Sequence, residues 1–150
     1  TRVRSSAASD VYKRQVHLVA LGEAWTVAKK SNLDLTKAYK GIAVSSGNSF
    51  VHETESQVIL NGSYNINFTM DLVLKDTGLF DELAKKLNAS LEISPKIVDI
   101  FKDGQKKYGS RAWSSMIVKR MEDINQINFR AEGFPEELVD NEPEKRGHEI

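Results

Sequence analysis

The spacing of hydrophobic residues predicts helices along most of the chain. The longest amphipathic pattern covers residues 69–87, where a helical period of about 3.6 residues gathers apolar side chains on one face. The members of this face are Leu72, Val73, Leu79, Phe80, Leu83, Ala84 and Leu87. Asp76 falls in the middle of the face, and Lys75 lies at its edge. Leu74 and Asp81 are expected to point the opposite way.

The position of Asp76 allows two interpretations. A carboxylate within an apolar stripe is costly unless it is paired or faces a polar cleft. An internal pair with Lys75, or a cap on a neighbouring helix, is the commoner arrangement for such a residue. The alternative hypothesis is that this helix borders a ligand site.

Two helices are predicted in the first third of the chain. Residues 16–30 carry apolar side chains almost all round the helix, which is typical of the centre of an α-helical core. This apolar surface also exceeds what a small helical monomer easily covers, so we expect the domain to self-associate. A short helix follows over residues 35–42, with Asp34 or Thr36 as its cap.

Later helix boundaries are indicated by local signals. Ser94 as the N-cap and Pro95 at the first helical position predict a helix start, and Gly109 is placed as the C-terminal cap of that helix. A last helix is expected to open at Ser114 or Ser115. The clearest β-branched cluster, at residues 58–60, is too short to predict a strand. The expected class is all-α, with five to six helices and no sheet.

Composition narrows the classes of function. The chain has 150 residues, 40% of them hydrophobic, which suits one domain with a real core. It has 21 basic and 21 acidic side chains, so no global field attracts nucleic acid. It contains no cysteine, which excludes zinc–thiolate sites and disulfides and suits a reducing compartment. No apolar run approaches the roughly 20 residues needed to span a bilayer, so no membrane partner is expected.

The two ends of the chain differ in charge. Residues 1–15 carry four bases against one acid, show no helical or strand period, and resemble translated adapter or vector sequence. We therefore expect a non-native or disordered leader there. Residues 131–150 carry seven acids against two bases, and the pattern fades from 124 onward. The expected organisation is a leader at 1–15, a helical domain at 16–123 and an extended acidic tail at 124–150.

A small polar loop separates the second and third predicted helices. It contains Ser46, Gly47 and Asn48, and the next helix can begin at Ser49. Free amides at a helix start bind anions, so the loop is a candidate ligand site. A plain linker with a serine cap is the commoner explanation.

Most catalytic and metal-binding motifs are absent. There is no Gly-x-Gly-x-x-Gly unit and no P-loop. The histidines His17, His52 and His148 are far apart. The segment at 52–55, His-Glu-Thr-Glu, is the nearest approach to a ligand cluster, but it is more typical of a solvated helix face. We expect no metal site.

Three segments give the chain a resemblance to a known family. The order of features over about residues 16–121 resembles the C-terminal helical domain of the β-hydroxyacid dehydrogenases, the relatives of 3-hydroxyisobutyrate and 6-phosphogluconate dehydrogenase. Glu23 and Ala24 on an apolar helix, followed by Asn-Leu-Asp at 32–34, look like the first helix and turn of that domain. The loop with Phe50 at its end looks like the family's Ser-Gly-x-Ser-Trp loop, with Phe in place of Trp.

The third segment is the most specific of the three. Lys75-Asp76-x-Gly78, with Phe68 ahead of it, looks like the family's Lys-Asp-Leu-Gly-x-Ala-x-Asp cofactor motif. The chain departs from that motif at Thr77, Phe80 and Glu82.

The resemblance implies a fold and a set of partners. The fold would be a C-terminal domain of the 6-phosphogluconate dehydrogenase-like type. The parent activity would be hydride transfer between NAD or NADP and a small β-hydroxyacid or its semialdehyde, in a cytoplasmic homodimer or tetramer. A Rossmann domain, missing from this chain, would hold the cofactor.

The resemblance also implies roles for single residues. Lys75, Asp76 and Phe68 would face the nicotinamide end of the cofactor. The loop residues Ser46, Gly47 and Asn48 would lie near the substrate. The catalytic lysine of the family would fall at Ala7 and its asparagine at Val11, so we expect no catalytic residue in this chain.

A second hypothesis belongs to a different class of function. The chain could be a stand-alone helical interaction module in which Lys75 and Asp76 are merely structural. Genomic sequence upstream of Gln15 separates the two, because the dehydrogenase hypothesis requires a Gly-x-Gly-x-x-Gly unit there.

Overall fold

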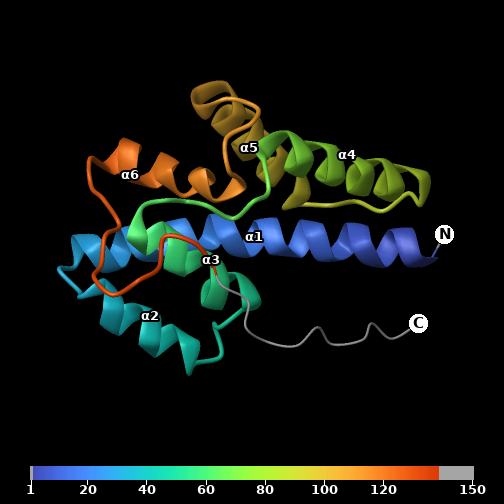
Figure 1. The fold of residues 1–150 in the computed structure, drawn as a ribbon. Coiled ribbons are helices and arrows are strands. Elements are labelled where there is room, and N and C mark those ends of the chain that lie inside the picture. Colours follow the sequence, from blue (N-terminus) through green and yellow to red (C-terminus); the bar gives the residue numbers. More distant parts are fainter. Residues whose placement is uncertain (1, 139–150) are drawn as a thin grey trace.

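A computed structural model of the chain describes residues 2–138, with side chains from Ser6 onward, and consists of helices joined by irregular connections (Figure 1). The elements are α1 (Arg2–Lys30), α2 (Leu35–Ala43), α3 (Phe50–Asn61), α4 (Met70–Lys86), α5 (Ser94–Tyr108), the 3₁₀ helix η1 (Ser114–Ile117) and α6 (Lys119–Asn125). The described part contains no strand, only an isolated bridge between Thr69 and Trp113. The all-α prediction is confirmed.

Helix α1 runs through the middle of the molecule. Figure 1 shows α2 and α3 on one side of it and α4, α5 and α6 on the other, and α1 contacts every one of them. Leu18, Leu21 and Trp25 on α1 are buried in the core, as the apolar pattern of residues 16–30 predicts. Part of the apolar surface stays uncovered, because Val27 is 67% exposed.

The predicted start of this helix at residue 16 is wrong, because α1 begins at Arg2. Residues 6–15 lack an apolar period, yet they pack lengthwise along the rest of the domain. The ring of Tyr12 stacks on Phe80 with centroids 4.5 Å apart, and Gln15 is fully buried. Tertiary packing of this kind stabilises a helix without a hydrophobic stripe. That residues 1–15 are not native to the protein stays a prediction.

Several predicted helix ends are confirmed in detail. The Asp34 side chain accepts a hydrogen bond from Lys37 N at 2.9 Å and caps α2, and Ser49 caps α3 by accepting from His52 N at 3.0 Å. Gly109 ends α5 with φ +96°.

Two starts differ from the prediction. Ser94 is the first residue of α5 rather than its cap, and its hydroxyl donates to Asp81 on α4. The segment that opens at Ser114 is the 3₁₀ helix η1, and α6 begins at Lys119.

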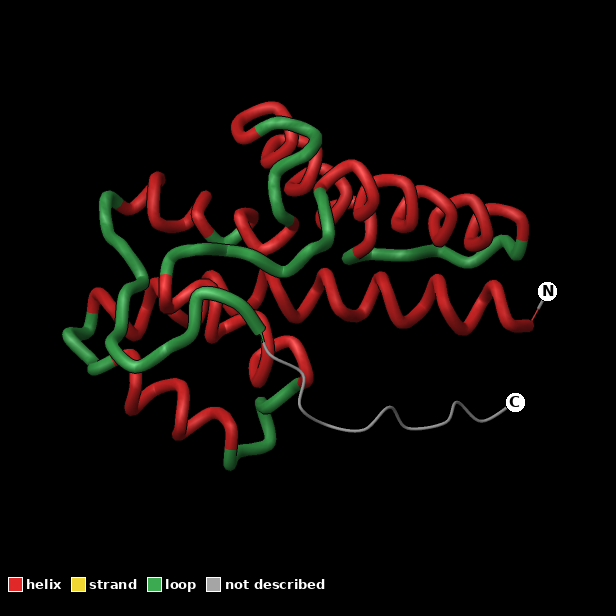
Figure 2. Tube along the Cα trace, in the orientation of Figure 1, coloured by secondary structure: helices red, strands yellow, loops and turns green. Residues whose placement is uncertain are grey.

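The stretch after α6 is irregular but packed. It runs back from the end of α6 toward α3 (Figures 1 and 2). Phe129 is fully buried in the core, Ala131 N donates to Leu60 O at 3.1 Å, and Asn61 Nδ2 donates to Phe134 O at 3.0 Å. The prediction of a solvated arm from residue 124 is therefore wrong for residues 126–138, which we name the C-terminal strap. The rest of the expected tail, 139–150, lies outside the described residues.

A buried polar cluster fastens the strap. Glu122 on α6 accepts hydrogen bonds from Arg130 Nη1 at 2.8 Å and from Phe129 N at 2.6 Å, and the Tyr64 hydroxyl donates to its other oxygen. Burial, together with the hydrogen bond to Glu122, raises the pKa of Tyr64 above its ordinary value. Because each polar group in the cluster has a partner, burying it is compatible with a stable fold.

Between residues 2 and 138, no helix has both the length and the apolar character required to cross a membrane.

The contact between the strap and Gly62 predicts the effect of a substitution at this glycine. This residue has φ +96°, and a Cβ added there would clash with Arg130 Nε. Arg130 cannot move aside without leaving Glu122. Gly62→Ala is therefore expected to lower the free energy of unfolding by at least about 1–2 kcal/mol, measured by chemical denaturation. Gly78→Ala in α4 is the control, because a Cβ there meets nothing within 4 Å. The control should stabilise by about 0.5–1 kcal/mol, and equal destabilisation by both variants would contradict the steric argument.

Candidate functional site

The face of α4 that enters the core differs from the predicted one. Its buried residues are Met70, Val73, Thr77 and Ala84, and Leu74 packs against the same core. Leu72 is 37% exposed and Leu79 is 52% exposed, although both belong to the predicted apolar face. The helix is thus turned so that one edge of the predicted face is buried and the other lies outside.

Thr77 is the physical reason for this difference. Its hydroxyl donates to Val73 O at 2.8 Å within the helix, so its polar group is satisfied and the side chain can be buried. Helix α4 also packs against both α1 and α5, and this double contact selects a buried arc that includes Thr77. A pattern that counts only apolar residues misses such a position.

Lys75 and Asp76 lie in the second turn of α4, on the side away from the core. The Lys75 side chain is exposed and the Asp76 side chain is half-buried. Among residues 2–138, neither side chain takes part in a hydrogen bond or ion pair. The internal Lys75–Asp76 pair, the commoner interpretation of the sequence, is therefore not formed.

Phe68 is held immediately ahead of α4. Its carbonyl oxygen accepts from Ser114 N at 2.7 Å, and its half-buried ring packs against the core. The Arg14 guanidinium lies over this ring, 5.2 Å from its centroid. The neighbouring residue Met70 donates its N–H to Ala112 O at 3.0 Å, so backbone groups of another segment cap the start of α4. Phe68 is thus held by a fixed backbone at the start of α4.

The loop with Ser46, Gly47 and Asn48 joins α2 to α3. Ser46 and Gly47 are exposed. Asn48 is engaged in capping α3: its Nδ2 donates to Glu53 Oε1 at 2.6 Å, and its Oδ1 accepts from Ser49 N at 2.8 Å. These bonds agree with the linker interpretation of the loop and leave only Ser46 and Gly47 free for a ligand.

The structure does not bring the two candidate sets together. In Figure 1 the connection from α2 to α3 lies on one side of α1, whereas α4 with Lys75 and Asp76 lies on the other. A ligand contacting both sets is not supported within one copy of the described chain.

Sequence reasoning missed the buried carboxylate of Glu55. The segment at 52–55 was expected as a solvated face, but His52 and Glu55 are almost fully buried and only Glu53 is exposed. Burial raises the pKa of Glu55, although Arg14, whose Nε donates to Glu55 Oε1 at 2.8 Å, acts to lower it. The sequence does contain a signal for the burial of Glu55: on a helical wheel of α3, Val51, Glu55 and Val58 share one face.

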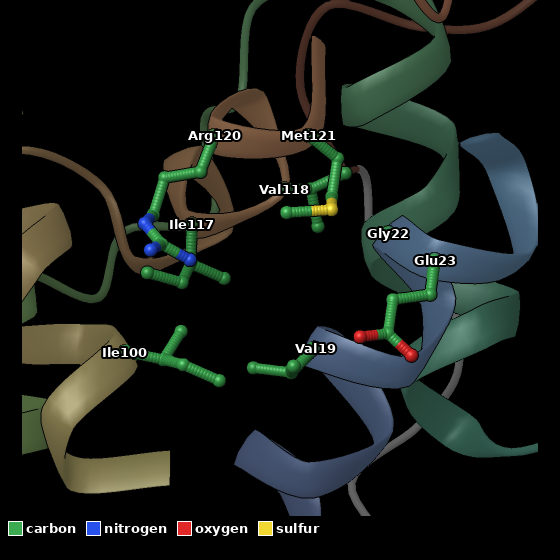
Figure 3. A pocket seen from close by; sticks show the side chains of 8 residues that line it. All are labelled: Val19, Gly22, Glu23, Ile100, Ile117, Val118, Arg120 and Met121. Atoms are coloured by element: carbon green, nitrogen blue, oxygen red, sulfur yellow. The ribbon is translucent and has the colours of Figure 1, made fainter. Parts of the chain in front are cut away.

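Glu23, which carries the start of the resemblance, borders a small hollow on the other side of α1 (Figure 3). The hollow is lined mainly by Val19, Ile100, Ile117 and Val118. Figure 3 shows the Glu23 carboxylate and the Arg120 guanidinium on opposite sides of it. Arg120 is engaged with Asp103 at 2.7 Å. With an aliphatic lining and its guanidinium already paired, the hollow offers little to a polar ligand.

No metal site is apparent, since the described residues contain no group of three or more His, Asp or Glu side chains placed to hold an ion.

Comparison with known proteins assigns the domain. The family model described as "NAD-binding of NADP-dependent 3-hydroxyisobutyrate dehydrogenase" matches residues 14–121. The chain belongs to this family. The match contains Phe68, Lys75 and Asp76 and ends before the C-terminal strap.

Curated relatives of this dehydrogenase domain include two L-threonate dehydrogenases. The enzyme from Haemophilus influenzae is 28% identical over 103 residues, which cover 68% of this chain and 34% of that protein. The enzyme from Escherichia coli K12 is 27% identical over the same coverage. The chain therefore spans about a third of the length of the curated relatives it matches.

Solved structures show the same fold. A 3-hydroxyisobutyrate dehydrogenase from Salmonella typhimurium superposes with a TM-score of 0.69 at 24% identity, over 75% of this chain and 40% of that one. A 3-hydroxyisobutyrate dehydrogenase from Mycobacterium tuberculosis, solved with L-serine, gives a TM-score of 0.66 at 18% identity, over 77% and 42%. The all-α architecture is thus that of the helical domain of this dehydrogenase family.

Because Lys75 has no partner in the described part of the chain, removal of its side chain is expected to have little effect on stability. Lys75→Ala should change the free energy of unfolding by no more than about 0.5 kcal/mol, because an exposed unpaired side chain is lost. Asp81→Ala on the same helix is the matched comparison, since it removes the acceptor of the Ser94 hydroxyl and should cost about 1 kcal/mol. Urea denaturation of both variants tests this. A Lys75→Ala loss as large as that of Asp81→Ala would show that the ammonium is structural.

Proposed function

We propose that this chain is the helical domain of an NAD(P)-dependent oxidoreductase that acts on a β-hydroxyacid, and that it forms part of the wall of the nicotinamide site. One observation carries the proposal. The Lys75-Asp76-x-Gly78 motif lies within the family match, and its two charged side chains have no partner among the described residues.

The surroundings of Lys75 and Asp76 support this role. Leu72 and Leu79 flank them on the outer face of α4, and both are substantially exposed. Apolar side chains beside unpaired charges are typical of a surface that another polypeptide or a cofactor covers. We infer that a Rossmann domain covers this face in the complete enzyme.

The donor set suits a nicotinamide. An ammonium can donate to a carbonyl or phosphate oxygen, a carboxylate can accept from the carboxamide N–H groups, and an aromatic ring can pack against the heterocycle. Lys75, Asp76 and Phe68 would supply these three contacts. The cofactor itself, when bound, supplies hydride transfer, and the protein supplies position and charge.

The chemical step requires a residue that this chain does not provide. By the family resemblance the catalytic lysine falls at Ala7 and the asparagine at Val11. The general acid/base that handles the proton of the substrate hydroxyl would therefore belong to a longer parent enzyme. Ser46 and Gly47 are free to contact substrate in that enzyme, whereas Asn48 would first have to leave its cap.

We also propose that the parent enzyme is a homodimer or tetramer. Val27 on α1, 67% exposed, and Phe50 at the start of α3, 79% exposed, are large apolar side chains outside the α4 face. Their exposure supports a contact with a second copy.

A chimeric enzyme tests the proposal. The nucleotide-binding part and the first half of the interdomain helix would come from the Haemophilus influenzae L-threonate dehydrogenase, and residues 16–138 of this chain would replace its helical domain. The chimera should reduce NAD or NADP with L-threonate or 3-hydroxyisobutyrate. Lys75→Ala should then raise the dissociation constant of the cofactor at least about tenfold, because a charge-assisted hydrogen bond is lost.

Two controls make the result interpretable. Lys86→Ala, an exposed lysine in the last turn of the same helix, should leave cofactor affinity unchanged. The 150-residue chain alone should show no turnover. A folded chimera that binds cofactor equally well with and without Lys75 would reject the proposed role of Lys75. A folded chimera without turnover would favour the stand-alone interaction module.

A further inference from the structure

The connection between α3 and α4 holds two residues in an uncommon backbone conformation. Five non-glycine residues in the described chain have positive φ. Three of them, Asn32, Asn88 and Gln126, follow the last residue of a helix, where the left-handed conformation ends the helix. Tyr64 (φ +54°) and Asn67 (φ +55°) instead lie within the connection, after the helix cap Gly62.

Tyr64 is the more informative of the two. Asparagine tolerates the left-handed region, but for a bulky side chain this conformation is a genuine outlier with a cost of about 1–2 kcal/mol. The surroundings compel it. The Tyr64 hydroxyl is bound by Glu122 and Arg130, and its carbonyl oxygen accepts from the Ser115 hydroxyl. Backbone strain that several contacts maintain in this way is concentrated at functional sites.

An indentation in the surface lies beside this turn and is lined in part by the residues that follow Tyr64. The indentation, which we name the Trp113 hollow, is open to solvent and has a volume of about 380 Å³. Its lining residues are Asn65, Ile66, Asn67, Trp113, Glu137 and Leu138. Asn65 Nδ2 donates to Glu137 Oε1 at 3.2 Å, which anchors the strap to the turn, whereas the Asn67 side chain is exposed and has no partner in the described chain.

The Trp113 hollow and the proposed nicotinamide wall are separate surfaces, but backbone hydrogen bonds connect the segment of Trp113 to the start of α4. Trp113 pairs with Thr69 in the isolated bridge, and the next residue, Ser114, donates its N–H to Phe68 O. The position of Trp113 is therefore fixed relative to the start of α4.

The lining defines the chemistry of a ligand. An indole face packs against apolar C–H groups, and an amide offers both donors and an acceptor to hydroxyl groups. Among the described residues of the lining, the charged one is Glu137, whose carboxylate accepts hydrogen bonds and repels anions. Because residues 2–138 contribute no basic side chain to the lining, they offer no counter-charge to a phosphate or carboxylate there.

We propose that the Trp113 hollow binds a neutral polyol, with the carbon chain against Trp113 and hydroxyl groups on the amide of Asn67 and the carboxylate of Glu137. The inference stands apart from the dehydrogenase proposal, because it requires neither a nicotinamide nor a second domain.

Nuclear magnetic resonance of the 150-residue chain tests it, with xylitol as the probe. The indole N–H signal of Trp113 and the side-chain amide signals of Asn67 should shift saturably, with a dissociation constant of the order of 1 mM. Trp25, the other tryptophan, is fully buried and should not respond. Xylonate, the corresponding carboxylate, should bind more weakly because of Glu137.

Two matched variants locate the site. Asn67→Gly keeps the left-handed backbone, removes the amide, and should weaken xylitol binding about fivefold. Asn88→Gly, at an exposed asparagine with φ +53° after α4, should leave it unchanged. No saturable shift at Trp113, equal weakening by the two variants, or tighter binding of xylonate than of xylitol would each overturn the proposal.

Discussion

The burial of α1 between two groups of helices is the constraint on which the rest of the structure depends. Helices α3, α4 and α6 all pack against α1, whose Trp25 is fully buried. Burial of large aromatic and aliphatic side chains is the dominant favourable contribution in such a core. Because α1 contacts all the other helices, it joins the two groups, within which α2 packs on α3 and α4 packs on α5.

This arrangement divides the surface of α4 into two parts. One edge faces α1 and α5. Thr77 is buried there because its hydroxyl donates to Val73 O within the helix. The opposite edge carries Lys75 and Asp76 between exposed leucines. An unpaired ammonium and carboxylate cost little on a hydrated surface but gain strength when a partner excludes water from them. The face is therefore suited to contacts that form only when another component covers it.

Local chemistry was predictable from the sequence, and long-range packing was not. The caps at Asp34 and Ser49 were found because a cap depends on side chain and backbone a few residues apart. The buried arc of α4 was not predicted correctly, because Thr77 can be buried only when its hydroxyl is hydrogen-bonded, and the hydrophobic pattern does not reveal that bond. The early start of α1 was missed because contacts such as Tyr12 on Phe80 connect residues far apart in sequence. The resemblance singled out Lys75 and Asp76 as candidates, whereas their lack of internal partners among residues 2–138 became visible only in the structure.

The C-terminal strap has a consequence for the order in which the chain can fold during synthesis. Helices α1 to α5 leave the ribosome before Phe129 and Arg130, so the turn at Tyr64 emerges without the side chains that hold it. A strained backbone without its supporting contacts relaxes to more common conformations. The nascent domain thus acquires its helical core first and its final α3–α4 geometry last, when the strap docks. Premature termination between residues 126 and 129 would release a product whose helices are complete and whose Tyr64 turn keeps Glu122 and Ser115 but lacks Arg130.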